Sequence, residues 1–392
     1  MRGNAVASET SAPRTATSAA ASDVRSDVNS PTTAASTAAS TATALPVAHL
    51  ARPAVVVSPY PVTTEQVVAQ IHADHPDHPR PHAIDRYGSR IGVRTRNYVA
   101  PLADVAVPGE LAPRNADAYA HVREMGARAA RRVLADHGVA PRDVDGVVTS
   151  HSTGLAIPGL DVHIVEDLGL SPRVARVPMT QLGCAGGAQA LVQAARLVAA
   201  GRRRVLVVVS ETLSTVYQSA DHGISAVIYK LLFSDAAAAC LVTAEPLGPG
   251  PVVEDTFEYW LPGSTAAYYL RVAGDGYHFD STRAAIDAVG EVMPELAAWT
   301  PAPEFGVIHP GGPAILDHVV KGFDVADDFV RHARASLSEM GNAGGVSVLD
   351  VLRRTFGAPP APGALGLIAA FGPGFVTAAL RVRWRGSGSA EV

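Results

Sequence analysis

The sequence predicts a layered α/β fold, and three patterns carry that prediction. From Ala54 onward, segments with strand-like and helix-like spacing alternate along the chain. The run RRVLVVVSE, residues 203–211, is continuously apolar and β-branched, which is typical of a strand buried on both faces of a sheet. Candidate reactive residues follow several of these strands directly, at the strand ends where α/β folds bind their ligands.

Each element is predicted from its own local pattern. Residues 118–138 carry apolar side chains at helical spacing and end at a glycine, which favours a helix with a glycine cap. The segment after Cys184, up to Gly201, has the same spacing. The other expected strands are 144–150, 235–244, 304–310, 363–374 and 376–384, and the other expected helices begin within 311–323 and 341–357.

Composition divides the chain into three parts. Residues 1–50 are rich in Ala, Ser and Thr with almost no large apolar side chain, so we expect a disordered extension. A proline-rich joint, residues 245–255, separates an expected N-terminal half, 51–247, from a C-terminal half, 248–392. The repeated order of strand, reactive turn and helix hints that the two halves are related.

Composition and charge also exclude several classes of function. Hydrophobic residues make up 47% and charged residues 18%, which is enough for a sizeable apolar core. The net charge of −5 gives no reason to expect nucleic acid or an anionic membrane as a partner. Two cysteines form neither a disulfide framework nor a zinc site, and the reducing cytosol fits them best. No apolar run approaches the ~20 residues of a membrane span.

Three residues on separate strand-to-helix turns are candidates for catalysis. Cys184 lies among glycines before a helix, whose N-terminal dipole and free N–H groups would favour a thiolate; a small buried thiol fits equally well. His309 ends a strand before Pro-Gly-Gly, and Asn342 lies in a glycine-flanked turn. A structural histidine and a turn-forming asparagine are the alternatives. Cys240, inside AAAACLV, is expected in the core.

Together the three residue types suit acyl chemistry. An imidazolium stabilises a thiolate, so a Cys–His pair makes a reactive nucleophile. An imidazole N–H and an amide N–H can both donate to one thioester oxygen, which stabilises an enolate. Decarboxylation of a malonyl thioester needs that stabilisation. The set therefore suits acyl loading on Cys184 followed by carbon–carbon bond formation.

Three longer motifs resemble one family, the type III polyketide synthases of the chalcone synthase-like branch of the thiolase superfamily. They are HPGGPAILD (309–317), GNAGGVSVLDVLRR (341–354) and AFGPGF (370–375), and QLGCAGG around Cys184 fits the family's nucleophile turn. The resemblance runs from about residue 54 to 384. It implies a thiolase-like αβαβα fold of two related halves, a homodimer, CoA thioester substrates, and no metal or redox cofactor. By this resemblance Cys184 takes a starter acyl group, and His309 and Asn342 hold malonyl-CoA while it loses CO₂.

The resemblance also assigns residues around the reaction centre. Phe233 matches a gatekeeper between the CoA tunnel and the cavity, and Tyr277 falls where a second gatekeeper Phe is usual. Arg86 and Arg90 fall where basic residues contact CoA phosphates, although solvated surface arginines are the alternative. Ile157 falls where the family pushes a side chain across the dimer interface into the partner's site.

Departures from the family pattern bear on the product. Ser152 stands where tetrahydroxynaphthalene synthases often have Cys. Leu213 replaces a Thr and Tyr268 replaces a Gly, and both fill volume, which permits fewer extensions. We therefore expect a bacterial-type enzyme that uses a short or medium fatty acyl starter and makes an α-pyrone or a resorcinol.

Four other functions remain open on sequence grounds. They are a tetrahydroxynaphthalene-type synthase that uses malonyl-CoA alone, a ketoacyl-carrier-protein synthase III-like enzyme making one condensation, an inactive binding homologue, and a papain-like hydrolase. An acyl carrier protein is a possible donor in place of CoA.

Overall fold

A computed structural model describes residues 47–282 and 284–386 of the chain. Most of the extension predicted for residues 1–50 lies outside the described residues. His49 and Leu50, which that prediction included, form the short strand β1 (His49–Leu50) of the main sheet.

The strands form one large mixed sheet and two separate antiparallel pairs. The large sheet contains β1, β2 (Ala54–Val57), β5 (Gly146–His151), β6 (Ala175–Thr180), β7 (Arg204–Thr212), β8 (Asp235–Thr243), β9 (Gly250–Trp260), β12 (Phe305–Ile308), β13 (Leu365–Gly372) and β14 (Val376–Arg385). Its order is β12-β13-β14-β9-β1-β8-β7-β5-β6, with β2 also paired to β8. The pairs β5–β6, β5–β7 and β12–β13 are parallel, and the other pairs are antiparallel. Separately, β3 (Tyr60–Thr63) pairs with β4 (Thr95–Tyr98), and β10 (Tyr268–Ala273) with β11 (Gly276–Ser281).

The helices surround and separate the strands. They are α1 (Thr64–Asp74), α2 (Pro81–Arg90), α3 (Leu102–Val105), α4 (Leu111–Asp136), α5 (Leu160–Leu168), α6 (Gly186–Ala199), α7 (Ile224–Leu232), α8 (Ala284–Trp299), α9 (Pro313–Phe323), α10 (Arg331–Met340) and α11 (Val346–Gly357). Short 3₁₀ turns are η1 (Pro141–Asp143), η2 (Gly183–Ala185), η3 (Leu213–Val216) and η4 (Asp327–Val330).

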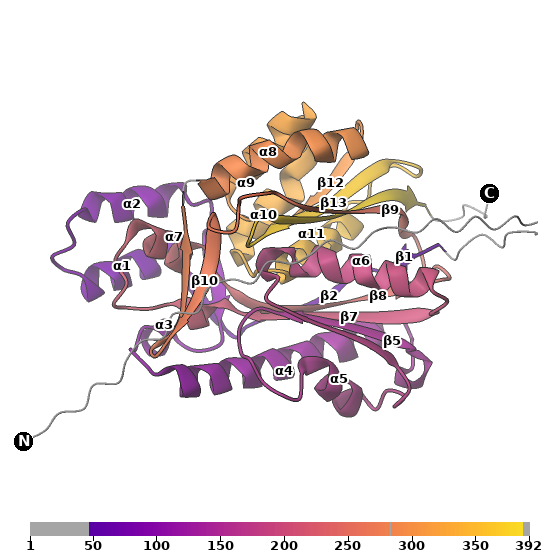
Figure 1. Ribbon diagram of the computed structural model, residues 1–392, viewed down its shortest axis with the longest axis horizontal. Coiled ribbons are helices and arrows are strands. Elements are labelled where there is room, and N and C mark those ends of the chain that lie inside the picture. Colours follow the sequence, from indigo (N-terminus) through magenta and orange to yellow (C-terminus); the bar gives the residue numbers. More distant parts are fainter. Residues whose placement is uncertain (1–46, 283, 387–392) are drawn as a thin grey trace, which may run out of the picture. The chain divides into compact units, whose positions relative to one another are not determined.

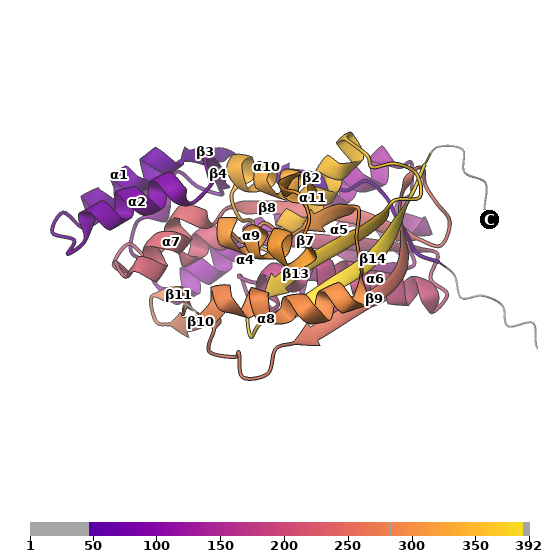
Figure 2. The same cartoon turned by 90° about the horizontal axis from the view of Figure 1, so that it is seen from above.

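These elements stack in five layers. In Figure 1, α4 and α5 lie below β5, β7 and β8, and α6 and α11 lie between those strands and β9, β13 and β14. The helices α8 and α9 form the outer layer on the opposite side, as the view from above in Figure 2 also shows. The predicted αβαβα arrangement is therefore confirmed. The sheet continues through β1 from β8 to β9, and the division into two related halves at residue 247 stays a prediction.

Burial explains why the central strands and helices form. All nine residues of β8 are buried, and so are all of β7 after its first residue, because helices cover both faces of these strands. The middle helix α6 is rich in Ala and Gly and is buried on most of its surface, as its position between two sheet layers requires. The expected strands and helices are present at nearly their predicted bounds, although α4 starts at Leu111 rather than at Ala118.

Candidate active site

One cavity brings the three predicted catalytic residues together. It has a volume of about 480 Å³, and Cys184, His309 and Asn342 all contribute to its wall. Most of the remaining wall is apolar, from α7, α8, α9 and the loop after β13. A larger hollow of about 730 Å³, lined by arginines and carboxylates of α4 and α11, contains none of the three. The smaller cavity is therefore the candidate active site.

Glycines shape the turn that carries Cys184. The residue lies in η2, directly before α6. Gly183 has φ +52°, and a Cβ atom there would lie 2.7 Å from Cδ of Pro373. A Cβ atom on Gly187 would lie 1.9 Å from the carbonyl oxygen of Gly345, so the first turns of α6 and α11 approach with no side chain between them. These two glycines thus serve the turn and the helix packing.

Backbone contacts fix the direction of the Asn342 amide. The residue follows Gly341, whose φ is +70°, and its N–H donates to the carbonyl of Leu232 at 2.8 Å. Its Oδ1 accepts a hydrogen bond from the N–H of Gly344 at 2.9 Å. Because only the oxygen can accept that bond, Nδ2 faces the cavity, where it lies 3.8 Å from Sγ of Cys184. An amide donor is therefore held beside the sulfur.

His309 is buried and has an unpaired ring. It follows β12, and its backbone N–H donates to the carbonyl of Ala369 at 2.8 Å. Neither Nδ1 nor Nε2 has a hydrogen-bond partner among the described residues. Burial lowers the pKa of His309 to about 3, so the imidazole is neutral near pH 7. Buried polar groups are normally paired, and an unpaired one calls for an explanation, which a bound substrate would supply.

The Cys184 thiol is also neutral in the empty cavity. Burial raises its pKa to about 11, against hydrogen bonds from Tyr268 and Asn342 that lower it. The sequence-based expectation that the start of α6 favours a thiolate is therefore wrong for the free enzyme, because desolvation outweighs the helix dipole. Thiol and imidazole do not form an ion pair before substrate arrives.

A buried carboxyl group, which the sequence did not suggest, lies near the nucleophile. Glu211, at the end of β7, accepts hydrogen bonds from the N–H and the Oγ of Ser152, both at 3.0 Å. Burial raises the pKa of Glu211 to about 8. Two residues that were predicted to line the cavity lie outside its wall. Ser152 contacts Glu211 instead, and Leu213 packs beside Gly344. Glu211 could have been singled out from the sequence, because it lies at the end of an otherwise apolar strand.

Other predicted residues occupy the wall and the mouth. Phe233 and Tyr268 line the cavity, and so do the exposed side chains of Arg86 and Arg90 from α2. Neither arginine forms an ion pair with a carboxylate within the described part of the chain. Ile157 lies elsewhere, fully exposed on the loop before α5.

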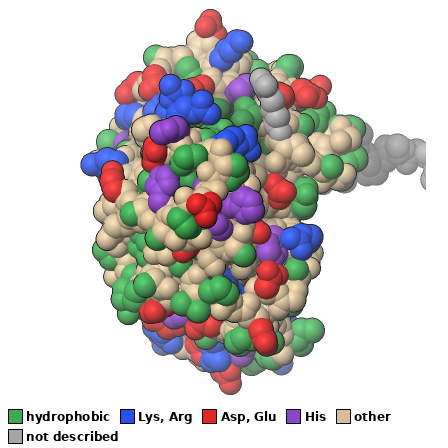
Figure 3. All heavy atoms as spheres, turned by 90° about the vertical axis from the view of Figure 1, so that its left-hand side faces the viewer, with side chains coloured by type: hydrophobic (Ala, Val, Ile, Leu, Met, Phe, Trp, Pro, Cys, Tyr) green, Lys and Arg blue, Asp and Glu red, His purple; other side chains and the backbone are tan. Residues whose placement is uncertain are grey.

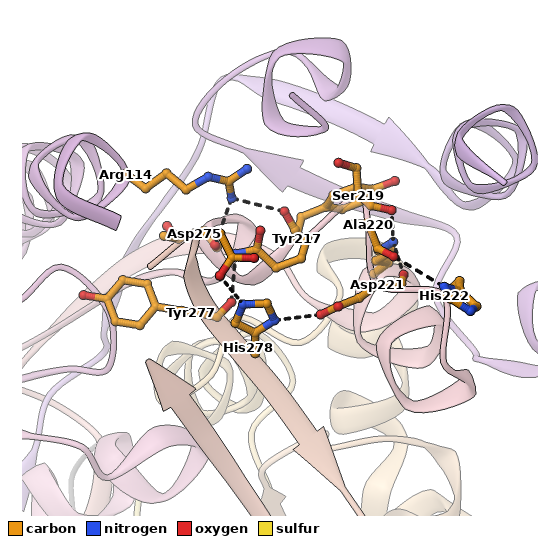
Figure 4. Close-up of polar contacts among 12 residues, drawn as sticks. Arg114, Tyr217, Ser219, Ala220, Asp221, His222, Asp275, Tyr277 and His278 are labelled. Carbon is orange, nitrogen blue, oxygen red and sulfur yellow. Dashed lines mark hydrogen bonds and ion pairs between the residues drawn. The ribbon is translucent and has the colours of Figure 1, made fainter. Parts of the chain in front are cut away.

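The structure places Tyr277 away from the predicted gatekeeper position. Tyr277 does not line the cavity; its hydroxyl donates to Oδ1 of Asn115 on α4. Figure 4 shows its ring turned away from the neighbouring His278. Alternation along β11 puts Tyr277 and Phe279 on the same face, but Tyr277 is two residues nearer the hairpin turn and so lies past the cavity. The ring of Phe279 instead contacts that of Phe233, with centroids 5.2 Å apart.

The described residues show neither a metal site nor a membrane span. No group of three or more His, Cys, Asp or Glu among them is arranged to hold a metal ion. No helix in the described ranges is long and apolar enough to cross a membrane. A buried thiol, a neutral imidazole and an oriented amide thus meet in one cavity, and this set of groups suits acyl transfer and condensation.

Comparison with known proteins identifies the family. The chain matches the N-terminal domain of chalcone and stilbene synthases over residues 100–246 and their C-terminal domain over residues 281–384. It belongs to this family and is a type III polyketide synthase. Enzymes of the family use CoA thioesters as substrates and need no cofactor.

Several relatives cover nearly the whole described part of the chain. A phloroglucinol synthase of Pseudomonas fluorescens is 34% identical over 337 residues, which are 83% of this chain and 96% of that protein. A 1,3,6,8-tetrahydroxynaphthalene synthase of Streptomyces griseus is 31% identical over 86% of this chain and 92% of its own length. The solved structure of germicidin synthase from Streptomyces coelicolor matches with a TM-score of 0.82 at 31% identity, covering 86% of this chain and 99% of that one.

Proposed function

We propose that this polyketide synthase loads a short or medium fatty acyl group from CoA onto Cys184 and extends it with malonyl-CoA. The observation that carries the proposal is the cavity itself, in which a buried thiol, an unpaired neutral imidazole and a fixed amide donor converge. The mostly apolar wall supports an aliphatic starter, because burying methylene groups there is favourable.

Loading begins with proton transfer between two neutral groups. His309 accepts the proton of the Cys184 thiol as the thioester of the starter approaches. The thiolate attacks the thioester carbonyl, its C–S bond to CoA breaks, and the CoA thiolate leaves with the proton from His309. The acyl group is then carried on Cys184. The neutral imidazole suits this step, since an imidazolium could not accept the proton.

Extension uses His309 again, now together with Asn342. An N–H of His309 and the Nδ2–H of Asn342 donate to the thioester oxygen of malonyl-CoA. The bond between the malonyl carboxylate and its neighbouring carbon breaks, CO₂ leaves, and the electron pair forms an enolate. The enolate carbon attacks the acyl-Cys184 carbonyl, and the sulfur leaves as a thiolate. The acyl chain, two carbons longer, is now a CoA thioester.

The product class follows from how little room the cavity leaves. Tyr268 lies beside Cys184 and fills space, so few extensions fit before the chain cyclises. We therefore propose an α-pyrone or a resorcinol as product.

An acyl-CoA panel tests the starter. The purified full chain is incubated with malonyl-CoA and one acyl-CoA at a time, and the products are identified by mass spectrometry. The proposal expects cyclised products that contain the fatty acyl starter. Efficient turnover of malonyl-CoA alone would replace it with the tetrahydroxynaphthalene-type alternative, and a single linear β-ketoacyl product with the synthase III-like one.

A homodimer and CoA donors belong to the same proposal. Ile157 is fully exposed beside the half-exposed Leu155, as a side chain that enters a partner's site would be. Arg86 and Arg90 give the mouth of the cavity two cations for a CoA pyrophosphate, and we propose no carrier protein. Sedimentation of Ile157→Asp against the unchanged chain tests the interface, and an unchanged dimer would contradict this placement of Ile157. The cytosolic location stays a prediction.

A further inference from the structure

Four aromatic rings pack together at one side of the catalytic cavity, and three of them line it. Tyr229 lies on α7 and Phe233 directly follows that helix, four residues further on, with ring centroids 5.0 Å apart and planes at 24°. Tyr268 and Phe279 come from the β10–β11 hairpin. The Phe279 ring touches all the others, with centroid distances of 4.6 Å to Tyr229, 5.2 Å to Phe233 and 5.3 Å to Tyr268. We call these four side chains the aromatic partition.

A second space lies on the far side of this partition. It is a hollow of about 220 Å³, which we call the outer hollow, and Phe279 and Ser225 contribute to its wall. Tyr229, Phe233 and Tyr268 line the catalytic cavity instead. Ser281 lines that cavity too, and its Oγ lies 3.4 Å from Oγ of Ser225. The two spaces are thus adjacent, and the aromatic rings separate them.

The chemistry of the wall changes at the partition. On the catalytic side Tyr229 has Ile228 and Leu232 as apolar neighbours in the cavity wall. The outer hollow is lined by charged side chains, among them Asp221, Arg271 and Asp280. Methylene groups gain by leaving water for an apolar wall, and they gain nothing beside solvated charges. The favourable path for an alkyl chain on Cys184 therefore ends at the partition.

We infer that Tyr229 determines specificity by setting the longest acyl chain that the enzyme accepts on Cys184. This inference rests on the proposed function and adds to it a residue and a length limit. Tyr229 is the member of the partition that can be changed without touching the reaction centre. Phe233 forms a backbone bridge with Asn342, Tyr268 hydrogen-bonds to Cys184, and Phe279 does not line the catalytic cavity.

Acyl loading tests the inference without requiring extension. The purified chain is incubated with straight-chain acyl-CoAs of graded length, and the acylated fraction of Cys184 is measured by intact-protein mass spectrometry. Loading by the unchanged enzyme should rise with chain length to a maximum and then fall. Tyr229→Ala should move the maximum to longer chains. The ratio of dodecanoyl to hexanoyl loading should rise at least about tenfold, since each further buried methylene is worth about fourfold.

Two variants separate ring volume from other effects. Tyr229→Phe keeps the ring and removes the hydroxyl, and it should keep the original length profile. Tyr269 follows Tyr268 in β10, and its side chain lines only the outer hollow. Tyr269→Ala removes the same side-chain volume as Tyr229→Ala, and it should leave the length profile unchanged. If Tyr229→Ala does not fold, Tyr229→Leu serves in its place.

The possible failures are distinct. If Cys184 is loaded but neither Tyr229→Ala nor Tyr229→Leu shifts the profile, the length limit is not set by Tyr229. If Tyr229→Phe shifts the profile as far as Tyr229→Ala, the hydroxyl rather than the ring is responsible, which also overturns the inference. If no acyl-CoA loads the unchanged enzyme, the proposed function fails instead.

Discussion

Two regions of the molecule treat buried polar side chains in opposite ways. In the catalytic cavity His309 has no hydrogen-bond partner among the residues described, and the thiol of Cys184 interacts with Tyr268 and, at 3.8 to 3.9 Å, with Asn342. Around residues 217–223, the loop before α7, polar side chains are densely paired. Figure 3 shows histidines gathered on that face of the protein, the left-hand side of Figure 1.

The contacts of the loop cluster are specific. His75 donates from Nε2 to the carbonyl of Ser219 at 2.6 Å, and Lys230 donates to the carbonyl of Asp221 at 2.6 Å. His278 lies 2.8 Å from a carboxylate oxygen at each ring nitrogen, Asp221 at Nδ1 and Asp275 at Nε2, as Figure 4 shows. The comparison shows that His75 and His278 hold the loop of residues 217–223 in place by hydrogen bonds. His309 in the cavity has no such partner among the described residues, which leaves it available to a substrate.

The largest expected effect separates the two cysteines. Cys184→Ala should lower turnover by more than about 10³-fold, because the covalent acyl intermediate cannot form. Cys240→Ala, in the buried core of β8, should retain acyl loading. Intact-protein mass spectrometry after incubation with acyl-CoA measures both. An acyl adduct on Cys184→Ala would contradict the assigned nucleophile.

Next in size is the contrast between two histidines. His309→Gln should lower the extension rate by about 10²-fold or more, since it removes the proposed base and donor. His278→Gln should keep that rate but lower the free energy of unfolding. Product formation and urea unfolding are measured on both variants. Equal losses of rate would break the distinction between the two regions.

The thiol itself gives a smaller and sharper test. With a Cys184 pKa of about 11, alkylation of the empty enzyme by iodoacetamide should speed up about tenfold per pH unit from pH 7 to 9. His309→Gln should show the same slope, because the neutral imidazole does not stabilise the thiolate. A rate that levels off near pH 7 would instead reveal a preformed thiolate–imidazolium pair.

The smallest expected effect is on stability, where the two histidines act in opposite directions. Burial lowers the pKa of His309 to about 3, so below pH 6.5 only the unfolded chain binds that proton and stability falls. Burial also lowers the pKa of His278, but hydrogen bonds to Asp275 and Asp221 outweigh it and raise the pKa. The stability that His278 adds to the folded chain is therefore fully present below pH 6.5, and it is lost as the pH rises through the pKa of the folded state.

Urea unfolding at pH 5.5 and 7.5 measures this difference. Between pH 7.5 and 5.5, the free energy of unfolding of His309→Gln should fall by about 1 kcal/mol less than that of the unchanged chain. His278→Gln should be less stable by no more than about 1 kcal/mol, mostly at pH 5.5, since its carboxylate partners are half exposed. Identical pH dependence in both variants would contradict the opposite pKa shifts.

Local patterns were enough to single out three residues that the fold brings into one cavity. Cys184 and His309 each lie between a strand and a helix, as predicted, whereas Asn342 lies between α10 and α11, so its predicted strand-to-helix turn is wrong. The layered α/β class followed from alternating elements and from a strand, β7, whose apolar run shows burial on both faces, whereas the five-layer arrangement came from the family resemblance. These turns and strands depend on residues that are close together in the sequence, so they can be predicted from the sequence alone.

Distant contacts explain what sequence reasoning missed. The pKa values of Cys184 and His309 depend on burial by α7, α8 and α9, which local sequence does not show. The resemblance put Tyr277 at the gate of the cavity, but how far β11 extends past the cavity decides that Tyr277 lies outside it. The i,i+4 spacing of Tyr229 and Phe233 was a signal for the aromatic partition that went unused.

The close approach of Gly187 and Gly345 has a consequence for how this scaffold can change. Cys184 precedes one of these helix starts and Asn342 precedes the other, and backbone meets backbone with no side chain between. The backbones of α6 and α11 therefore set the spacing of the two residues, and a substitution of Tyr229 on α7 is expected to leave it unchanged. The proposed acyl-length limit and the proposed chemistry thus depend on different segments of the chain.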